Sequence, residues 1–529
     1  MEKIKNSHYL IIIGFFSFFL NYYYSTLGVF PIDTFLHYDS AYKILNSDYP
    51  IRDYWIVSGF FVDFFQAFFF KIFGVNWNAY IIHSSFINLI ASILVFKIFQ
   101  NYKLSKKSSF IYSVSFSFLA YTISGTPFVD LHAIYLCFIA FYLIVDNILN
   151  NRFSFFSWSL VSIIYFVAFL SKQVPSLYLI LINIFFLTLF FIYKKKIKLI
   201  IFIIIFSLVL ILFFLIFLKL LNIGITEFYI QYINYPSSIG INRFKNFNFS
   251  FESLFNKYKF ILLPISFLIA IKINKLRKDK SSFTKKENII FYIFVSMVFV
   301  LFAHQLLTKN QIYIYFLIPL CFGFLEVELA KIKFNYKKIV NFILLILVMI
   351  ITTQYHLRYN VQRKFHELEN TDLSKSINAS LISKDLKNLR WLNPFYKDGP
   401  VEEINLLSNV IKAIEKNELE VALITNYIFL DSVTKKNINY FNKTFTLDGA
   451  SMPLENSKYF NYYVKFLYQK ILNKKIQKIY FINKENLNQE LLTNYVDEKC
   501  YYQEKDDIFT VYKIKVDCIA RELKTFNRF

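Results

Sequence analysis

Glycine and proline are scarce in this chain, with ten residues of each among 529. The sequence contains no internal repeat and no linker rich in proline or glycine, and its polar C-terminal part has no nucleotide-binding glycine loop and no nucleophile elbow. Acidic residues are outnumbered 36 to 59 by lysine and arginine, which gives a formal net charge of +23. About 18 of these net charges fall in residues 1–356, where basic residues cluster between apolar blocks. That distribution is typical of membrane topology and argues against a nucleic-acid partner.

Cysteine is also rare, with four residues and no metal-ligand spacing among them. Cys137 and Cys321 lie inside apolar blocks, where we expect inert core residues. Cys500 and Cys518 flank a polar stretch near the C-terminus. They could form a disulfide if that region is extracytoplasmic, and the sequence leaves this open.

Apolar residues are in excess: 56% of the chain is hydrophobic, and the mean hydropathy is +0.42. A soluble globular chain is about 45–50% apolar, and here the apolar residues form long blocks. Most of the chain is therefore predicted to lie in a bilayer, which excludes a soluble enzyme, a fibrous protein and a disordered chain. Eleven blocks predict membrane spans, near residues 8–30, 77–99, 109–126, 131–149, 153–171, 174–193, 198–221, 258–273, 289–307, 311–329 and 339–356.

The loops between these spans differ in lysine and arginine content, roughly 21 in one set against 8 in the other. This bias predicts a cytoplasmic N-terminus in the cytoplasmic (inner) membrane, and an odd number of spans then places the C-terminal part outside. The first block is too long for a cleaved signal peptide and lacks a cleavage site. We therefore expect a membrane domain over 1–356 and an extracytoplasmic domain over 357–529.

The two extracytoplasmic parts have different patterns. The first outer loop, 31–76, contains several aspartates and then an apolar stretch that is interrupted by Asp63 and Gln66. This stretch favours a helix on the membrane surface over a further span. The C-terminal domain alternates helical and strand patterns, which predicts an α/β fold. Its predicted helices cover 401–417 and 456–473, and its predicted strands cover 420–425, 477–482 and 508–516.

Polar and ionisable side chains gather at the outer ends of the predicted spans, whereas the span interiors are nearly free of charge. The candidates are Asp39, Arg52, Asp53, Asp130, His132, Lys172, Gln173 and His304. Each alone has an ordinary explanation, such as a solvated carboxylate, a helix cap or a lysine that extends to the interface. Together they indicate a site, because ionisable groups at this depth cost several kcal/mol unless they are paired or used.

This set of residue types suits one kind of reaction. A carboxylate can take a proton from an acceptor hydroxyl, while arginine and lysine stabilise a departing phosphate. Asp130 and His132 also have the chemistry of metal ligands, although two ligands do not make a metal site. The sequence therefore leaves open whether the site binds a divalent cation such as Mg²⁺ or Mn²⁺.

The stretch from Asp39 to Trp55, DSAYKILNSDYPIRDYW, followed by Phe-Gly and a span, resembles the first outer loop of GT-C membrane glycosyltransferases. That superfamily includes the aminoarabinose and protein O-mannosyl transferases, which use sugars linked to polyprenyl phosphate. Asp39 matches their first acidic position, Arg52 and Asp53 match a Pro-x-Arg-Asp stretch, and Asp130 matches the second acidic position. The resemblance implies that Asp39 is the catalytic base of a reaction that inverts the anomeric centre. The family often has Asp-Glu where this chain has Asp39-Ser40, which leaves the metal requirement open.

The leading hypothesis is a glycosyltransferase that moves a sugar from a polyprenyl-phosphate donor to a glycan, lipid or protein acceptor at the outer face. Asp39 is the expected base, and Asp53 or Asp130 orients the acceptor or a cation. Arg52, Lys172 and His304 are expected to bind the donor phosphate, and His132 and Gln173 are further substrate-binding candidates. The alternatives are a flippase for glycolipids or envelope precursors, and a glycan polymerase or ligase. The charged residues are expected at one end of the spans only, which favours surface chemistry over translocation. Burial would separate Asp39 from Asp53, because the base should line a cavity and the other should be hydrogen-bonded in the loop.

Overall fold

The computed structural model describes residues 6–245, 250–278, 285–308, 314–333, 335–362, 368, 371–416, 421–436 and 438–526. Contacts divide the chain into two compact units, each assembled from three separate segments. Unit 1 consists of Met1–Thr26, Ile81–Phe214 and Arg243–Thr371, and unit 2 consists of Leu27–Tyr80, Leu215–Asn242 and Asp372–Phe529. The outer loop 31–76 thus belongs to the same unit as most of the C-terminal region.

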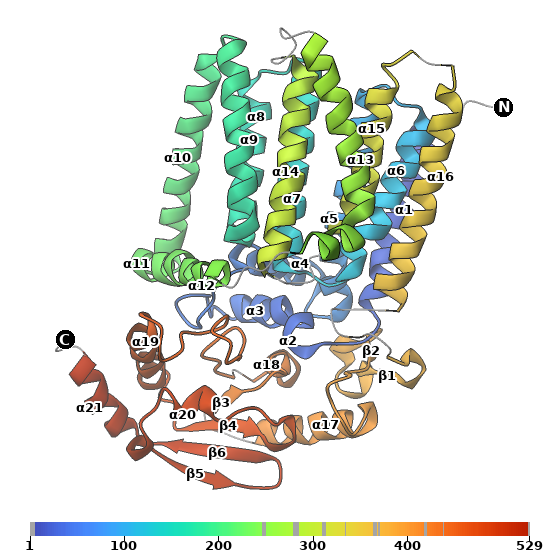
Figure 1. Ribbon diagram of the computed structural model, residues 1–529. Helices are drawn as coiled ribbons and strands as arrows, with labels where there is room; N and C mark the ends of the chain where they lie inside the picture. The colour runs from blue at the N-terminus through green and yellow to red at the C-terminus, as the bar shows by residue number, and fades with distance from the viewer. Residues whose placement is uncertain are drawn as a thin grey trace. The chain divides into compact units, whose positions relative to one another are not determined.

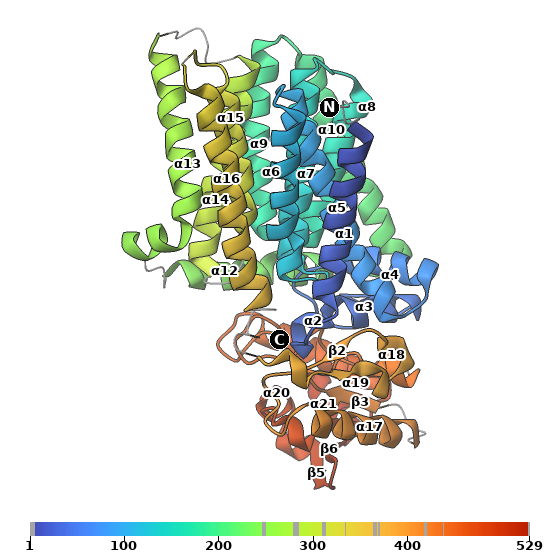
Figure 2. The same ribbon diagram turned by 90° about the vertical axis from the view of Figure 1, so that its right-hand side faces the viewer.

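Unit 1 is a bundle of long apolar helices that run roughly parallel to one another (Figure 1, Figure 2). Each of the eleven apolar blocks in the sequence overlaps one of them. They are α1 (Asn6–Ser25), α5 (Trp77–Asn101), α6 (Lys106–Leu119), α7 (Val129–Leu149), α8 (Phe155–Ser171), α9 (Gln173–Tyr193), α10 (Ile197–Leu220), α13 (Phe251–Lys278), α14 (Lys286–Thr308), α15 (Leu317–Leu329) and α16 (Lys337–His356), the last followed by the π-helical turn η5 (Leu357–Val361).

Within the described residues, seven helices are long and apolar enough to cross a membrane: α5, α7, α9, α10, α13, α14 and α16. The other four, α1, α6, α8 and α15, are 13 to 20 residues long. Two of these are next to a 3₁₀ turn, since η1 (Tyr121–Ile123) follows α6 and η4 (Ile314–Phe316) precedes α15. The polytopic membrane character of the chain is confirmed, whereas the predicted count of eleven spans is not.

Helices α7 and α10 show the extremes of burial in the bundle. In the window that defines each span, 89% of α7 is buried inside the protein but only 6% of α10, although the mean hydropathy of α10 reaches 3.6. A helix that is apolar all round and has so little protein cover requires lipid around it. Helix α7 is instead surrounded by protein, so the polar groups at its start are placed inside the bundle.

Unit 2 contains a four-stranded mixed sheet in the order β3-β4-β6-β5. Strands β3 (Val421–Ile424) and β4 (Lys478–Ile482) are parallel, whereas β6 (Phe509–Ile514) is antiparallel to both β4 and β5 (Tyr501–Lys505). The α/β prediction is confirmed for this sheet, and the three predicted strands correspond to β3, β4 and β6. Strand β5 was not predicted, because its sequence, YYQEK, is polar and exposed, as is common for an edge strand.

Short helices and a second small sheet complete unit 2. The predicted helices of the C-terminal domain are present as α17 and α19. The elements are α2 (Pro31–Thr34), α3 (Leu36–Leu45), α4 (Phe60–Phe73), α11 (Ile225–Phe228), the π-helix η2 (Tyr229–Asn234), the start of α12 (Tyr235–Lys245), strands β1 (Ile377–Asn378) and β2 (Arg390–Trp391), α17 (Pro400–Lys416), α18 (Leu430–Thr434), α19 (Phe460–Asn473), α20 (Glu490–Thr493) and α21 (Val516–Phe526). Short 3₁₀ turns η6 (Leu373–Lys375), η7 (Ala379–Leu381), η8 (Lys384–Leu386), η9 (Asn483–Glu485) and η10 (Glu498–Cys500) join them.

Helix α4 corresponds to the apolar stretch of the outer loop, and its polar residues face the interior of the protein. With 14 residues it is too short to span a bilayer. Asp63 and Gln66 are fully buried, while Phe68, Ile72 and Phe73 are more than half exposed. The polar face of α4 is thus directed into unit 2, and its exposed face is apolar.

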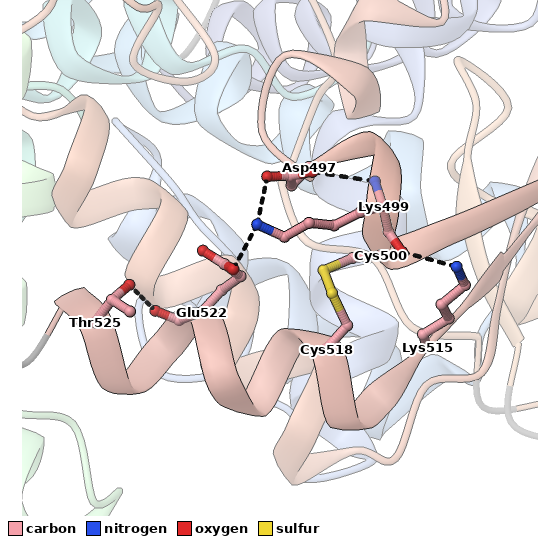
Figure 3. Close-up of a disulfide and its surroundings, with 7 residues drawn as sticks. All are labelled: Asp497, Lys499, Cys500, Lys515, Cys518, Glu522 and Thr525. Atoms are coloured by element: carbon pink, nitrogen blue, oxygen red, sulfur yellow. Dashed lines mark hydrogen bonds and ion pairs between the residues drawn. A yellow bond between two sulfur atoms is a disulfide. The ribbon is translucent and has the colours of Figure 1, made fainter.

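A disulfide joins Cys500, at the end of η10, to Cys518 in α21, with 5.3 Å between the two Cα atoms (Figure 3). Figure 3 also shows Lys499 between two carboxylates, at 3.0 Å from Asp497 and 2.8 Å from Glu522. Cys137 and Cys321 are free and buried. The crosslink therefore ties the last helix of unit 2 to the start of β5.

The Cys500→Ser/Cys518→Ser variant is expected to lose about 2–4 kcal/mol of stability, because the bond restricts the unfolded chain across 18 positions. The unfolding midpoint of the purified full-length protein should fall accordingly. In cells, alkylation followed by mass spectrometry should modify Cys500 and Cys518 only after reduction. Alkylation of both thiols without a reductant would contradict the disulfide and would also count against an extracytoplasmic location.

Candidate functional site

Asp130 lies at the start of α7, where a glycine turn directs it into the bundle. Gly125 has φ +74°, and an added Cβ atom would come within 3.0 Å of the backbone of Ser25, so this tight turn favours glycine. The carbonyl of Gly125 accepts hydrogen bonds from the side chains of Asn21 and Ser25, at 3.1 and 2.5 Å. Asp130 then falls in the first helical turn, where the helix dipole favours a carboxylate.

Lys172 and His304 surround the Asp130 carboxylate. Lys172 Nζ lies 2.5 Å from Asp130 Oδ2, and His304 Nε2 lies 3.7 Å from Oδ1. Lys172 occupies the extended residue between α8 and α9, and His304 lies in the last turns of α14. The Asp130 and His304 side chains are buried, whereas that of Lys172 is 22% exposed. Lys172 is therefore the most accessible side chain of the three.

His132 lies beside this cluster on a different face of α7, because residues two positions apart do not share a helix face. Its Nε2 is 2.8 Å from Nε2 of His83, and its Nδ1 contacts the hydroxyl of Tyr121. Asp130 and His132 are thus not brought together as a ligand pair. Gln173, the first residue of α9, is half-buried next to Lys172.

Sequence reasoning missed His83 and Tyr121. His83 could have been noticed, because it is an ionisable residue inside a predicted span. Tyr121 left no such signal among the many aromatic residues of the chain. Both hold His132 in place, since Tyr121 also accepts a hydrogen bond from the backbone N–H of Phe128, at 2.9 Å.

The donor set around Asp130 does not fit a divalent cation. In the described part of the chain, no group of three or more His, Cys, Asp or Glu side chains is placed to hold a metal ion. Lys172 already provides the positive charge next to the carboxylate. A metal ligand set would need further oxygen donors in place of this ammonium.

Asp39, in α3 of unit 2, is buried in a network of its own. Its Oδ2 lies 2.9 Å from Nζ of Lys43, one helical turn away, and that ammonium lies 3.7 Å from the ring centroid of Tyr440. The carboxyl of Asp431, in α18, is hydrogen-bonded to Asp39. Burial, followed by the charge of Asp39 and this hydrogen bond, raises the pKa of Asp431 well above its usual range. The raised pKa favours the protonated form of Asp431, which can donate a hydrogen bond to Asp39.

Asp53 and Arg52 form hydrogen bonds and ion pairs that hold the loop between α3 and α4. Asp53 accepts hydrogen bonds from the Tyr49 N–H at 2.8 Å and from Arg52 Nε at 2.6 Å, and it forms an ion pair with Lys470 at 2.9 Å. Burial raises the pKa of Asp53, but these partners, Lys470 above all, outweigh it and hold the pKa below the usual value. Arg52 also donates to the Leu221 carbonyl at 3.0 Å. Of the two aspartates, Asp53 is the one hydrogen-bonded within its loop.

A buried ion pair that sequence reasoning did not identify joins the first and last of the three segments of unit 2. Lys443 Nζ lies 2.6 Å from Asp63 Oδ2, and Asp63 Oδ1 lies 2.6 Å from His37 Nδ1. Burial raises the pKa of Asp63 to about 7 and lowers the pKa of Lys443, since both charged forms lose their hydration. Asp63 was conspicuous as a charge in an apolar stretch, but Lys443 lies 380 residues away and gave no local signal.

A second charged cluster lies at the opposite end of the helices of unit 1. Glu328 lies 2.9 Å from Lys272 and 2.7 Å from Lys331, and Lys272 donates to Asn288 at 2.9 Å. Asn288 and His304 are on the same helix, α14, about 24 Å apart along its axis at 1.5 Å per residue. The expectation that buried charge is confined to one end of the bundle is wrong, because α13, α14 and α15 also bring charged side chains together at the other end.

No family model and no curated protein matches the sequence. Among solved structures, the chain is similar to the Archaeoglobus fulgidus oligosaccharyltransferase, in a crystal structure of its complex with zinc and sulfate. The identity is 11% and the TM-score 0.46, over 96% of this chain and 73% of that one. At this level of similarity, the roles of residues have to be argued from the geometry of this chain.

Lys443→Met is expected to destabilise the protein by about 3–5 kcal/mol, because it leaves the carboxylate of Asp63 buried without its counter-charge. The double variant Asp63→Leu/Lys443→Met removes both charges and should recover most of that loss. The measurement is the unfolding midpoint of the full-length protein in detergent. Lys435→Met, which breaks a surface pair with Asp385, is the matched control and should change stability by about 1 kcal/mol or less. If the double variant is no more stable than Lys443→Met, the ion pair is not what requires the lysine.

Proposed function

We propose that the protein is a membrane glycosyltransferase of the GT-C type. It moves a sugar from a polyprenyl-phosphate donor to a hydroxyl of a glycan, lipid or protein acceptor, on the outer face of the cytoplasmic membrane. The N-terminus is then cytoplasmic and the C-terminal region extracytoplasmic. The observation that carries the proposal is the buried Asp130–Lys172–His304 cluster at one end of an apolar helix bundle.

Lys172 is the proposed phosphate-binding group. An ammonium binds phosphate as a point charge, and it acts most strongly where little water competes. Asp130 positions this ammonium through the 2.5 Å contact, and His304 adds a further group within reach of the same site. When the bond between the sugar and the phosphate breaks, negative charge develops on the phosphate oxygen, and Lys172 stabilises it.

The surroundings suit a lipid-linked donor. Lys172 directly precedes α9, and the spanning windows of α9 and α10 are only 33% and 6% buried inside the protein. These helices therefore offer apolar surface to the bilayer. A polyprenyl chain can stay in the hydrocarbon layer while its phosphate reaches the helix end where Lys172 lies.

Asp39 is the proposed catalytic base, as the resemblance to GT-C enzymes implies. It takes the proton of the acceptor hydroxyl, the acceptor oxygen bonds to the anomeric carbon, and the bond from that carbon to the phosphate oxygen breaks. A single displacement of this kind inverts the anomeric centre. Both carboxylates are engaged within unit 2, Asp39 by Lys43 and Asp431 and Asp53 by Arg52 and Lys470. The choice of Asp39 over Asp53 therefore rests on the resemblance.

A glycolipid flippase is the second candidate. The observation that favours it is the buried Lys272–Glu328 pair at the opposite end of the bundle from Lys172, since a translocation path needs polar groups at both ends. A polymerase or ligase of preassembled glycans uses similar chemistry at the outer face and is separated from the first proposal by its products.

Lys172→Met is expected to reduce sugar transfer by about 10²–10³-fold, because it removes a charge that stabilises the departing phosphate. Mass spectrometry of glycans and glycolipids, in null cells complemented with each variant, should show one defined sugar that is restored by the wild type and absent with Lys172→Met. Asp146→Asn, on the same helix as Asp130 but in an exposed pair with Arg152, is the control and should restore the sugar.

The double variant Asp130→Asn/Lys172→Met separates a functional cluster from a structural ion pair. If the pair only stabilises the bundle, removing both charges should restore folding and the sugar together. We expect a well-expressed double variant that still lacks the sugar. Accumulation of lipid-linked precursors with loss of whole glycans would point to the flippase or the ligase instead.

Asp39→Asn is expected to abolish the same product, with a loss of about 10²–10⁴-fold for a missing general base. Asp431→Asn is the matched control: the amide keeps a hydrogen-bond donor towards Asp39, so transfer should continue. Asp53→Asn should lower expression or stability more than transfer per folded molecule. Full restoration of the glycan profile by Asp39→Asn would show that Asp39 is not the base.

A further inference from the structure

Unit 2 contains a cavity of about 520 Å³ that the proposed reaction does not use. Its walls come from the start of α2, the loop after β2, and the loops that follow β3 and β4. Strands β3 and β4 are parallel neighbours, so both loops leave the same carboxyl edge of the sheet. That edge is where α/β sheets commonly bind ligands, and the volume is in the usual range for a small-molecule site.

Aromatic rings line one part of this cavity. Phe30 and Phe395 lie with their ring centroids 5.2 Å apart, and Tyr396 and Tyr427 line the cavity with them. Phe395 is 56% exposed. A large aromatic side chain at the mouth of a cavity presents a flat apolar face to whatever enters.

Two polar atoms of the cavity lack partners within the described protein. They are Oδ1 of Asn426 and the hydroxyl of Tyr396, both buried at the atom level. A buried polar atom without a hydrogen bond costs about 1–3 kcal/mol. Each of these two atoms can be satisfied by a hydroxyl group of a ligand, because a hydroxyl both donates and accepts.

Two carboxyl groups hold the walls of the cavity: Glu403, which is buried, and Glu485, which is half-buried. Glu403 accepts hydrogen bonds of 2.7 Å from Trp391, Asn393 and Tyr427. Glu485 accepts from the Thr425 hydroxyl at 2.6 Å and from the Asn426 N–H. Burial raises the pKa of Glu485 to about 8. A site that is rigid before binding loses less entropy when it is occupied.

We propose that this cavity binds an uncharged sugar unit of a glycan. A pyranose ring has an apolar face that stacks on aromatic rings and a rim of hydroxyls that pair with amide and phenol groups, which matches the Phe30, Phe395, Tyr396 and Asn426 set. The lining carries two lysines, Lys397 and Lys484, and two carboxyl groups, those of Asp398 and Glu485, so it does not favour a strongly charged ligand. That the bound glycan is the acceptor rests on the proposed glycosyl transfer, whereas binding itself does not.

The test is saturation-transfer NMR on the full-length protein in detergent, with soluble neutral trisaccharides of glucose, galactose, mannose and N-acetylglucosamine as probes. At least one probe is expected to bind with a Kd in the millimolar range or tighter. Phe395→Ala and Asn426→Ala should each weaken that binding at least fivefold. Tyr502→Ala, an equally exposed aromatic residue on β5, is the control and should leave the Kd unchanged. Phe395 is exposed, so its truncation tests the site without threatening the fold.

Failure of this proposal and failure of the proposed function give different results. If no trisaccharide binds, or if Phe395→Ala and Asn426→Ala bind as tightly as the wild type, the cavity is not a sugar site, whatever the glycan profile shows. If a trisaccharide binds as expected but Lys172→Met cells keep their full glycan profile, the cavity proposal holds and the transfer mechanism falls.

Discussion

A charge that leaves water has to meet an opposite charge or lose its proton, and this constraint organises both units. In unit 1, Asp130 meets Lys172 near one end of the helices and Glu328 meets Lys272 near the other. In unit 2, Asp63 pairs with Lys443, and the raised pKa of Asp431 favours its protonated form. A pair of this kind adds little stability over an apolar core, but losing one partner is costly. The pairs therefore specify which segments pack together more than they strengthen the packing.

Most of the helical architecture could be predicted from the sequence, because long apolar blocks and the distribution of lysine and arginine are local properties of the chain. The strands β3, β4 and β6 were likewise predictable from short apolar runs. Strand β5 was not, since its polar sequence follows an edge strand and has no apolar alternation. The number of membrane spans could not be fixed from the sequence pattern, because several helices are shorter than the apolar blocks that they overlap.

The candidate site was predictable only in part, for a similar reason. Asp130, Lys172 and His304 stand out as ionisable residues next to apolar blocks, and the structure brings these three together. Interaction partners that are distant in sequence give no such local signal. Lys443 and Asp431 lie in a region whose sequence pattern is that of an ordinary soluble domain. Only the fold brings Lys443 to Asp63 and Asp431 to Asp39.

Unit 2 is assembled from three stretches of chain, and this has a consequence for the timing of synthesis. Asp63 leaves the ribosome 380 residues before the lysine that neutralises it. At 5–20 residues per second, the carboxylate waits roughly 20 to 80 seconds for its partner. During that interval α4 carries an unpaired charge on one face and bare phenylalanines on the other. The nascent loop thus has to be kept from aggregating until the last third of the chain arrives, and a ribosome that stalls after α16 leaves a membrane bundle with an unfinished unit attached.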